Sequence, residues 1–148
     1  MKVELRNVTK AFPSRNKKSG EEVIAVNDCS FTIPDGKLIG LLGPSGCGKS
    51  TTLYMICGLQ KPTKGQIFFG EDDVTGLAPE NRGVGLVFQN YALFPNMTVR
   101  QNILCGMRHI KDKAEKEARL NKYVSMFRLE VLENHRPAQL SGGHAQRT

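Results

Sequence analysis

The sequence has no long hydrophobic run and no C-x-x-C pair. Its longest clean apolar run, residues 38–42, is far shorter than the roughly 20 residues that a membrane-spanning helix needs. Polar and charged residues follow Met1, so we expect no secretory leader, and four cysteines without a leader argue against a disulfide-stapled secreted domain. The missing C-x-x-C pair disfavours a zinc site. We therefore expect a soluble cytosolic protein.

The composition is that of an ordinary globular domain with a basic balance. A length of 148 residues and a hydrophobic content of 39% exclude disorder, collagen and coiled coil as overall descriptions. Lys and Arg number 21 against 14 Asp and Glu, a net charge of +7 that suits nucleic acid, an anionic membrane surface or phosphorylated ligands. The densest basic group, Arg15, Lys17 and Lys18, has no interleaved aromatic residue beyond Phe12. We interpret it as a solvated loop, with a nucleic-acid patch as the alternative.

Hydropathy patterns predict strands and one helix in the first half of the chain. Alternating apolar and polar residues indicate strands over 2–8 and 29–33. Residues 38–42 are almost wholly apolar, the pattern of a strand that is buried on both faces. A glycine-rich stretch follows, and then residues 49–57 fit a helix. This order of elements is typical of an α/β fold.

The second half of the chain changes character. Short apolar runs at 67–69 and 84–88 indicate further strands joined by turns. Thr98 and Gln101 then form a T-x-x-Q capping box that predicts a helix start. A second helix is expected over 111–128, and no strand pattern follows the 84–88 run. We therefore expect a small helical insertion rather than a continuation of the sheet.

Residues 43–51 read GPSGCGKST and fill the pattern G-x-x-x-x-G-K-S/T of a P-loop. Glycines let successive backbone N–H groups turn around an anion with no Cβ in the way, and the helix that follows adds its positive N-terminal end. Lys49 places a mobile charge on the outer phosphates, and the Ser50 hydroxyl is an oxygen ligand suited to Mg²⁺. This motif predicts a nucleotide or other phosphate ligand, without deciding between an ATPase motor, a kinase and a GTPase.

Two further motifs carry a family resemblance. The stretch VFQNYALFP over 87–95 resembles the Q-loop of ABC-transporter ATPase subunits, and LSGGHAQR over 140–147 resembles their LSGGQ signature. The P-loop and these two motifs occur in the family's order and together cover essentially the whole chain. The string LFPNMTV over 93–99 is similar to importer ATPases for sugars, polyamines and ferric iron.

The resemblance implies an α/β P-loop NTPase of the ABC ATPase type, with a strand-rich N-terminal part and an α-helical subdomain. Its expected domains are 1–95, a P-loop core with the N-terminal strands and the Q-loop, and 96–148, a helical subdomain that ends in the signature. The family continues with a Walker B strand whose Asp and Glu serve Mg²⁺ and the attacking water, and no apolar strand ending in Asp-Glu occurs in this sequence. We expect an incomplete sheet, no visible catalytic base, and a truncated fragment that does not turn over ATP alone.

The resemblance also implies a role for each motif in binding ATP and Mg²⁺. Phe12 stands where the family stacks an aromatic ring on adenine, with a core aromatic as the alternative. Ser50 and Gln89 are the expected metal contacts, and the signature should contact the γ-phosphate of the ATP held by a second subunit. The expected nucleotide-binding residues are Phe12, Gly43, Pro44, Ser45, Gly46, Cys47, Gly48, Lys49, Ser50, Thr51, Gln89, Ser141, Gly142, Gly143 and His144.

His144 departs from the family pattern, which has Gln at this position. A neutral imidazole donates one hydrogen bond and accepts one, and imidazole groups titrate near neutral pH. The sequence thus raises the hypothesis that the pairing of two subunits around ATP is weakly pH-sensitive.

The implied function is the ATP-binding subunit of an ABC importer. Its expected partners are ATP, membrane-spanning permease subunits and a second ATPase subunit, and we expect it in the cytoplasm, peripheral on the inner face of the cell membrane. Phe94, Met97 and Met107 are candidates for a groove that receives the permease, or for ordinary core. We expect no nucleic-acid partner. The alternatives are a soluble ABC ATPase that acts on nucleic acid or ribosomes, and a non-catalytic nucleotide-binding module.

Overall fold

The computed structural model describes residues 1–14 and 21–148, which form two compact units. Residues Met1–Leu86 form the first, here called the sheet unit, and Val87–Thr148 form the second, the helical unit. The division falls at the start of the Q-loop-like stretch, whereas the sequence placed it after Pro95. The basic group Arg15, Lys17 and Lys18 lies outside the described residues.

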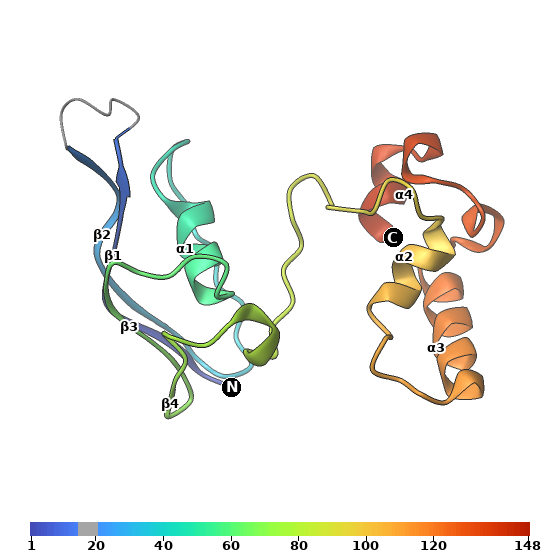
Figure 1. Ribbon diagram of the computed structural model, residues 1–148, viewed down its shortest axis with the longest axis horizontal. Coiled ribbons are helices and arrows are strands. Elements are labelled where there is room, and N and C mark those ends of the chain that lie inside the picture. Colours follow the sequence, from blue (N-terminus) through green and yellow to red (C-terminus); the bar gives the residue numbers. More distant parts are fainter. Residues whose placement is uncertain (15–20) are drawn as a thin grey trace. The chain divides into compact units, whose positions relative to one another are not determined.

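The sheet unit is built on a four-stranded antiparallel sheet in the order β2-β1-β3-β4 (Figure 1). The strand β1 spans Val3–Pro13 and β2 spans Glu22–Ile33. The strand β3 covers Lys64–Phe69, which confirms the strand expected at 67–69, and β4 is the short pair Asp72–Asp73. The long central strand β1 therefore pairs with a segment on each side.

The β1–β2 pair is longer than the sequence patterns indicated. It continues on both sides of an irregularity in register near Asn7 and Asp28. Both residues have positive φ angles, 49° and 44°, and the Asn7 amide donates to the Asp28 carboxylate at 2.9 Å. The Asn7 backbone N–H donates to the Ser30 hydroxyl at 2.8 Å, and Asp28 N–H donates to the Thr9 hydroxyl at 3.0 Å. These side-chain bonds stand in for missing ladder bonds, as in a β-bulge. The strand therefore continues through positions where alternation breaks.

One face of the sheet packs against helix α1, Lys49–Ile56 (Figure 1). The buried side chains share a single apolar cluster in which α1 contributes Met55 and Ile56. The strand and turn residues of this cluster are Leu5, Val8, Val26, Ile67, Phe69 and Val74. Gly58, at φ 81°, ends the segment, as expected of a glycine just past a helix.

Two strands expected from the sequence are absent from the described residues. Residues 38–42 and 84–88 carry no strand pairing, and the side chains of Leu38 and Leu42 are 99% and 95% exposed. An apolar segment becomes a strand only when a neighbouring segment accepts and donates its ladder bonds, and no such neighbour lies beside 38–42 or 84–88 among residues 1–14 and 21–148. The predictions of a buried strand at 38–42 and of a short strand at 84–88 were therefore wrong.

The helical unit contains three α-helices: α2, Val99–Cys105; α3, Lys113–Met126; and α4, Gly142–Arg147. The capping box at the start of α2 is confirmed, because the Thr98 hydroxyl accepts from Gln101 N–H and the Gln101 side chain accepts from Thr98 N–H at 2.8 Å. Short 3₁₀ turns, Pro79–Asn81 in the sheet unit and Glu130–Leu132 and Pro137–Gln139 in the helical unit, complete the secondary structure.

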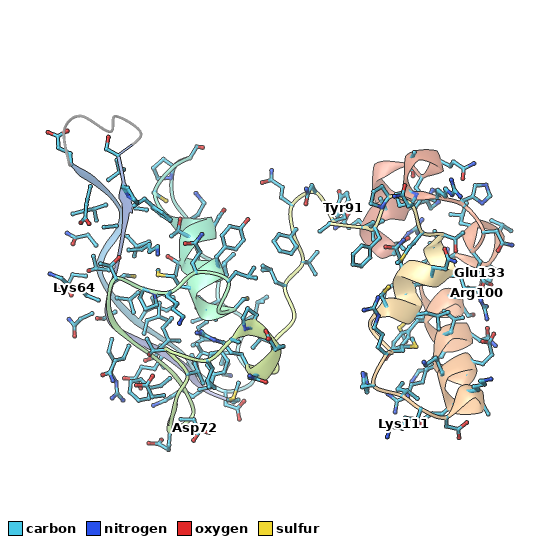
Figure 2. All side chains as sticks on the ribbon, in the orientation of Figure 1. Lys64, Asp72, Tyr91, Arg100, Lys111 and Glu133 are labelled. Carbon is cyan, nitrogen blue, oxygen red and sulfur yellow. The ribbon has the colours of Figure 1, made fainter. Side chains whose placement is uncertain are left out.

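The helical unit has its own core and one ion-pair cluster. Val99, Leu120, Val124 and Leu129 are at most 2% exposed and pack together. Arg100, labelled with Glu133 in Figure 2, pairs with that carboxylate at 3.0 Å and with Glu117 on α3 at 2.6 Å. This pairing joins α2 to α3 and to the residue that follows the Glu130–Leu132 turn. Among the described residues, no helix has both the length and the apolar character needed to span a membrane.

Candidate functional site

The P-loop lies between the 38–42 segment and α1, and it approaches β2 closely. Gly48 has φ 90°, and a Cβ built there would lie 2.4 Å from the carbonyl oxygen of Ala25 and 2.9 Å from Val26 Cγ2. Only glycine fits this position, for reasons both of backbone angle and of space. The backbone of the loop therefore passes directly against the β2 backbone at Ala25.

Lys49 begins α1 and folds back over the P-loop. Its Nζ donates to the carbonyl oxygens of Gly43 at 2.8 Å and Pro44 at 2.7 Å, and lies 3.6 Å from Cys47 Sγ. The ammonium therefore sits over the same loop whose backbone N–H groups are expected to face an anion. A phosphate oxygen at the loop offers this ammonium a stronger, charge-assisted partner than the two carbonyls.

Thr52, in the first turn of α1, is a residue that the sequence patterns did not single out. Its side chain is 6% exposed, and its hydroxyl donates to the carbonyl oxygen of Gly48 at 3.0 Å, while its N–H donates to the same oxygen at 2.8 Å. These two bonds fix the peptide that connects the P-loop to α1. The available signal was its position four residues after Gly48, where a Thr hydroxyl reaches back to the preceding turn.

Arg82 is a second residue that sequence patterns missed. The side chain is buried, and its guanidinium donates to the carbonyls of Met55 and Ile56 at 2.8 and 2.9 Å, which end α1. It also donates to Leu77 O at 3.0 Å and Thr75 O at 3.1 Å. A cation at the carbonyl end of a helix complements its dipole. Burial lowers the pKa of the Arg82 guanidinium from its ordinary value.

Gly58 makes room for Arg82, because a Cβ at Gly58 would lie 2.6 Å from the arginine Nε. The guanidinium therefore locks the far end of the P-loop helix onto the turn at 75–82. Nothing in the local sequence marks this role, since a single Arg between Asn81 and Gly83 has no periodicity.

Phe12 lies on β1 opposite Val23, and the Lys10 Nζ lies 5.0 Å from the centre of its ring. Ala25 lies two residues farther along β2, and its carbonyl oxygen is the one that Gly48 approaches. The half-buried ring is therefore carried by the same end of the β1–β2 pair that supports the P-loop. This register is compatible with the expected adenine contact.

A cavity of about 270 Å³ lies beside the P-loop, lined by Cys47, Lys49, Thr52 and residues of β2. A second cavity of about 330 Å³ is lined by Lys49, Ser50 and apolar side chains such as Phe31 and Leu53. Ser50 is exposed on the first turn of α1, so its hydroxyl is accessible to a cation that shares the phosphate oxygens. The donor set thus fits Mg-nucleotide, because a hydroxyl and phosphate oxygens are the hard ligands that Mg²⁺ takes.

Gln89 is exposed and belongs to the helical unit, in a turn over 88–92. Tyr91, labelled in Figure 2, and Ala92 have positive φ angles of 62° and 51°. Two successive non-glycine residues in the left-handed region are uncommon, and such backbone costs roughly 1–3 kcal/mol per residue. The turn is closed by Tyr91 N–H, which donates to Phe88 O at 2.9 Å.

The signature-like residues lie at the start of α4. Ser141 caps this helix, its hydroxyl accepting from His144 N–H at 3.4 Å. The same hydroxyl lies 2.8 Å from Nδ1 of the His144 ring. Gly142 and Gly143 are exposed, and a Cβ at either would meet no atom within 4 Å. The serine therefore has two bonds to His144 and an open side next to the glycines.

The structure brings Gly43 to Thr51 together over the P-loop and the first turn of α1, and Ser141 to His144 together on one turn. Gln89 and the signature-like turn belong to the helical unit, and the P-loop with Phe12 belongs to the sheet unit. Among the described residues, no group of three or more His, Cys, Asp or Glu side chains forms a metal site.

Comparison with known proteins agrees with the three motifs. The family model described as ABC transporter matches residues 26–148. The sulfate/thiosulfate import ATP-binding protein CysA 2 of Agrobacterium fabrum is 45% identical over 150 residues, covering 99% of this chain and 42% of that protein. The Fe(3+) ions import ATP-binding protein FbpC of Escherichia coli K12 is 42% identical over 146 residues, covering 98% of this chain and 40% of that protein.

The same family appears among solved structures. A dimeric structure of MJ0796, a bacterial ABC transporter cassette, superposes with a TM-score of 0.85 at 32% identity, covering 98% of this chain and 66% of that one. This match confirms the expected fold class, a P-loop NTPase of the ABC type. The chain spans less than half the length of the curated relatives it matches. On this evidence, the chain belongs to the ABC transporter family.

Proposed function

We propose that this chain binds Mg-ATP at the P-loop and is part of the ATP-binding subunit of an importer. The observation that carries the proposal is the P-loop itself, with Gly48 pressed against β2 and the Lys49 ammonium over the loop. Relatives whose names state import of sulfate/thiosulfate and of Fe(3+) ions support the importer assignment. They do not select a solute for this chain.

Calorimetric titration of the chain with Mg-ATP tests this proposal. Lys49→Ala removes the ammonium that would bond the outer phosphates, so we expect affinity to fall roughly tenfold or more. The control is Lys64→Ala, an exposed lysine on β3 that is labelled in Figure 2 and should leave affinity unchanged. Equal affinities for the two variants would contradict nucleotide binding at the P-loop.

We infer that two copies pair around two ATP molecules, with Ser141, Gly142 and Gly143 of one copy at the γ-phosphate of the ATP held by the other. The dimeric structures of MJ0796, one of them bound to ADP and Pi, support this arrangement. Gln89 would contact Mg²⁺ or the attacking water. Phe12, Ser45, Gly46, Cys47 and Thr51 complete the proposed nucleotide contacts with the rest of the P-loop.

We further propose that hydrolysis needs residues beyond those in this chain. The sequence has no apolar strand that ends in Asp-Glu, the pair that would hold Mg²⁺ and activate water. Steady-state phosphate release by the 148-residue chain, abolished in Lys49→Ala, would overturn this part while leaving the binding proposal intact.

A groove on the helical unit supports the proposed permease contact. A cavity of about 400 Å³ is lined by apolar side chains in and just after α2 and α3, among them Ile103, Met107, Tyr123 and Phe127, and by polar ones such as Asn102, Arg119 and Arg147. Tyr123 and Phe127 are 39% and 40% exposed, so their rings are open to a partner helix, whereas Met107 is buried. Phe94 is 53% exposed, and Met97 lines a separate cavity of about 270 Å³.

We propose that a helix of the membrane subunit lies in this groove, which places the subunit on the inner face of the cell membrane. Co-purification with the permease should be lost in Tyr123→Glu, which puts a charge in the groove, and retained in Tyr123→Phe.

We propose no nucleic-acid partner. Salt-sensitive binding to RNA or DNA would instead favour a soluble ABC ATPase that acts on nucleic acid.

A further inference from the structure

The hydroxyl of Ser141 has a competing partner inside its own turn. Ser141 Oγ lies 2.8 Å from Nδ1 of His144, an ordinary hydrogen-bond distance. It also accepts the His144 backbone N–H at 3.4 Å, within helix capping. A serine hydroxyl has one proton to donate and two lone pairs. What the hydroxyl offers to a ligand therefore depends on which of the two atoms, Oγ or Nδ1, holds the proton between them.

With a neutral ring whose Nδ1 is unprotonated, the Ser141 hydroxyl must donate its proton to Nδ1. Only a lone pair then remains toward solvent, and a lone pair repels a phosphate oxygen. When the ring takes up a proton, Nδ1–H donates to Oγ, and the hydroxyl proton becomes free to donate outward. The ring also gains a positive charge next to the exposed turn. Both changes favour an anion at Ser141.

We propose that His144 is a proton-operated switch on the signature serine, which releases the Ser141 hydroxyl for the γ-phosphate of ATP when the ring is protonated. This rests on the proposed function, in which Ser141 of one copy meets the ATP of another. A glutamine at this position would not act in this way, because its amide does not titrate near neutral pH. Pairing of two copies around ATP is therefore stronger in mild acid than in mild base.

We assign the switch to His144 alone because of the charged groups that do and do not contact its ring. On α4 the charged neighbour is Arg147, one turn further along. Among residues 87–148, no carboxylate or cation of another element forms an ion pair or hydrogen bond with the His144 ring. The ion pairs of the helical unit join Arg100 to Glu117 and Glu133, and Arg119 to Glu115.

The first experiment observes the hydrogen bond directly. Imidazole ¹⁵N chemical shifts of His144 in the ¹⁵N-labelled chain report which ring nitrogen carries the proton. At pH 8 we expect Nδ1 to be the unprotonated acceptor, and we expect Ser141→Ala to change the shift of this nitrogen. An Nδ1–H tautomer at pH 8, or ¹⁵N shifts that stay the same in Ser141→Ala, would overturn the proposal. This test needs no nucleotide.

The second experiment measures Mg-ATP-dependent self-association of the chain by sedimentation velocity at pH 6 and pH 8. We expect about tenfold tighter association at pH 6, the range that a hydrogen bond to a charged group supplies. His144→Gln should remove this difference, and His109→Gln, the same change on an exposed histidine of the helical unit, should keep it. An unchanged pH difference in His144→Gln would overturn the switch.

Failure of the switch is distinguishable from failure of the proposed function. Mg-ATP binding that Lys49→Ala weakens, without association at either pH, contradicts the proposed pairing of two copies and with it the switch, and retains the P-loop assignment. Association that is equal at pH 6 and pH 8 contradicts the switch alone. Binding that is absent or insensitive to Lys49→Ala contradicts the proposed function, and the ¹⁵N shifts then still decide whether the hydroxyl donates to His144.

Discussion

The two units reach their structures by different routes. In the helical unit, helices begin where short-range signals place them: Thr98 and Gln101 cap α2, and Asp112 caps α3 by accepting from Ala114 N–H at 2.8 Å. Two equally clear apolar segments, 38–42 in the sheet unit and 84–88 at its end, across the division between the units, form no strand in the described residues. A helix satisfies its own backbone groups, whereas a strand needs a second segment.

The contrast extends to the contacts that hold each unit together. The end of α1 in the sheet unit depends on Arg82, 26 and 27 residues away from the two helix carbonyls it bonds. The start of α2 depends on a residue three positions along the chain. Substitutions in the sheet unit should therefore lower the free energy of unfolding more, and over a wider region, than substitutions at the helix caps.

The largest effect is expected for Arg82→Met. This change leaves four carbonyl oxygens without their guanidinium donor, two of them at the end of α1. The free energy of unfolding of the sheet unit should fall by roughly 3 kcal/mol, as when one partner of a buried polar network is removed. Urea unfolding followed by circular dichroism measures it.

The matched control for Arg82 is Arg6→Met on β1. Arg6 is exposed, pairs with Glu4 at 2.8 Å, and lies over the ring of Phe68 at 4.1 Å. Exposed pairs of this kind contribute little to stability, so Arg6→Met should cost far less than Arg82→Met. Equal losses for the two arginines would show that the buried network at α1 does not dominate the sheet unit.

An intermediate effect is expected for Thr98→Ala in the helical unit. The change deletes the hydroxyl that accepts from Gln101 N–H and leaves that donor at the start of α2 unpaired. The expected cost is about 1 kcal/mol, and Thr98→Ser should restore most of it. Amide hydrogen exchange should be faster over 99–105 and unchanged in the sheet unit. A loss of protection in both units would contradict their separate stabilisation.

The smallest effect is a pH dependence of the sheet unit. Hydrogen bonds from Arg6 and then Lys2 lower the pKa of Glu4 to about 2 from 4.5. Because the folded pKa is the lower one, this contribution is present above pH 4.5 and is lost as the pH falls from there toward 2. Glu4→Gln should flatten the acid limb of a thermal-unfolding profile. A profile that keeps its slope in this variant would assign the loss to other carboxylates, such as Asp73, whose pKa the Thr75 hydroxyl lowers.

Sequence reasoning found the site residues that form a local motif, and it missed residues whose role depends on their contacts in the folded chain. The P-loop could be recognised from the sequence because its glycines and Lys49 act through bonds that span only a few residues. Thr52 and Arg82 were missed, since the first looks like any helical threonine and the second acts on a helix far away in sequence. The Ser141–His144 pair lies between these cases: its spacing was visible, and its 2.8 Å contact was not.

The sequence by itself determined the features that close over a few residues: the P-loop motif, the start of α2, the cap of α3, and the turn that opens α4. Only the tertiary structure decided which apolar segments became strands, how β1 and β2 continue through the bulge at Asn7, and where the Arg82 cation is placed. The physical reason is that a turn or a cap is satisfied by its immediate neighbours in sequence. A ladder bond or a buried guanidinium needs partners that the chain brings together only on folding.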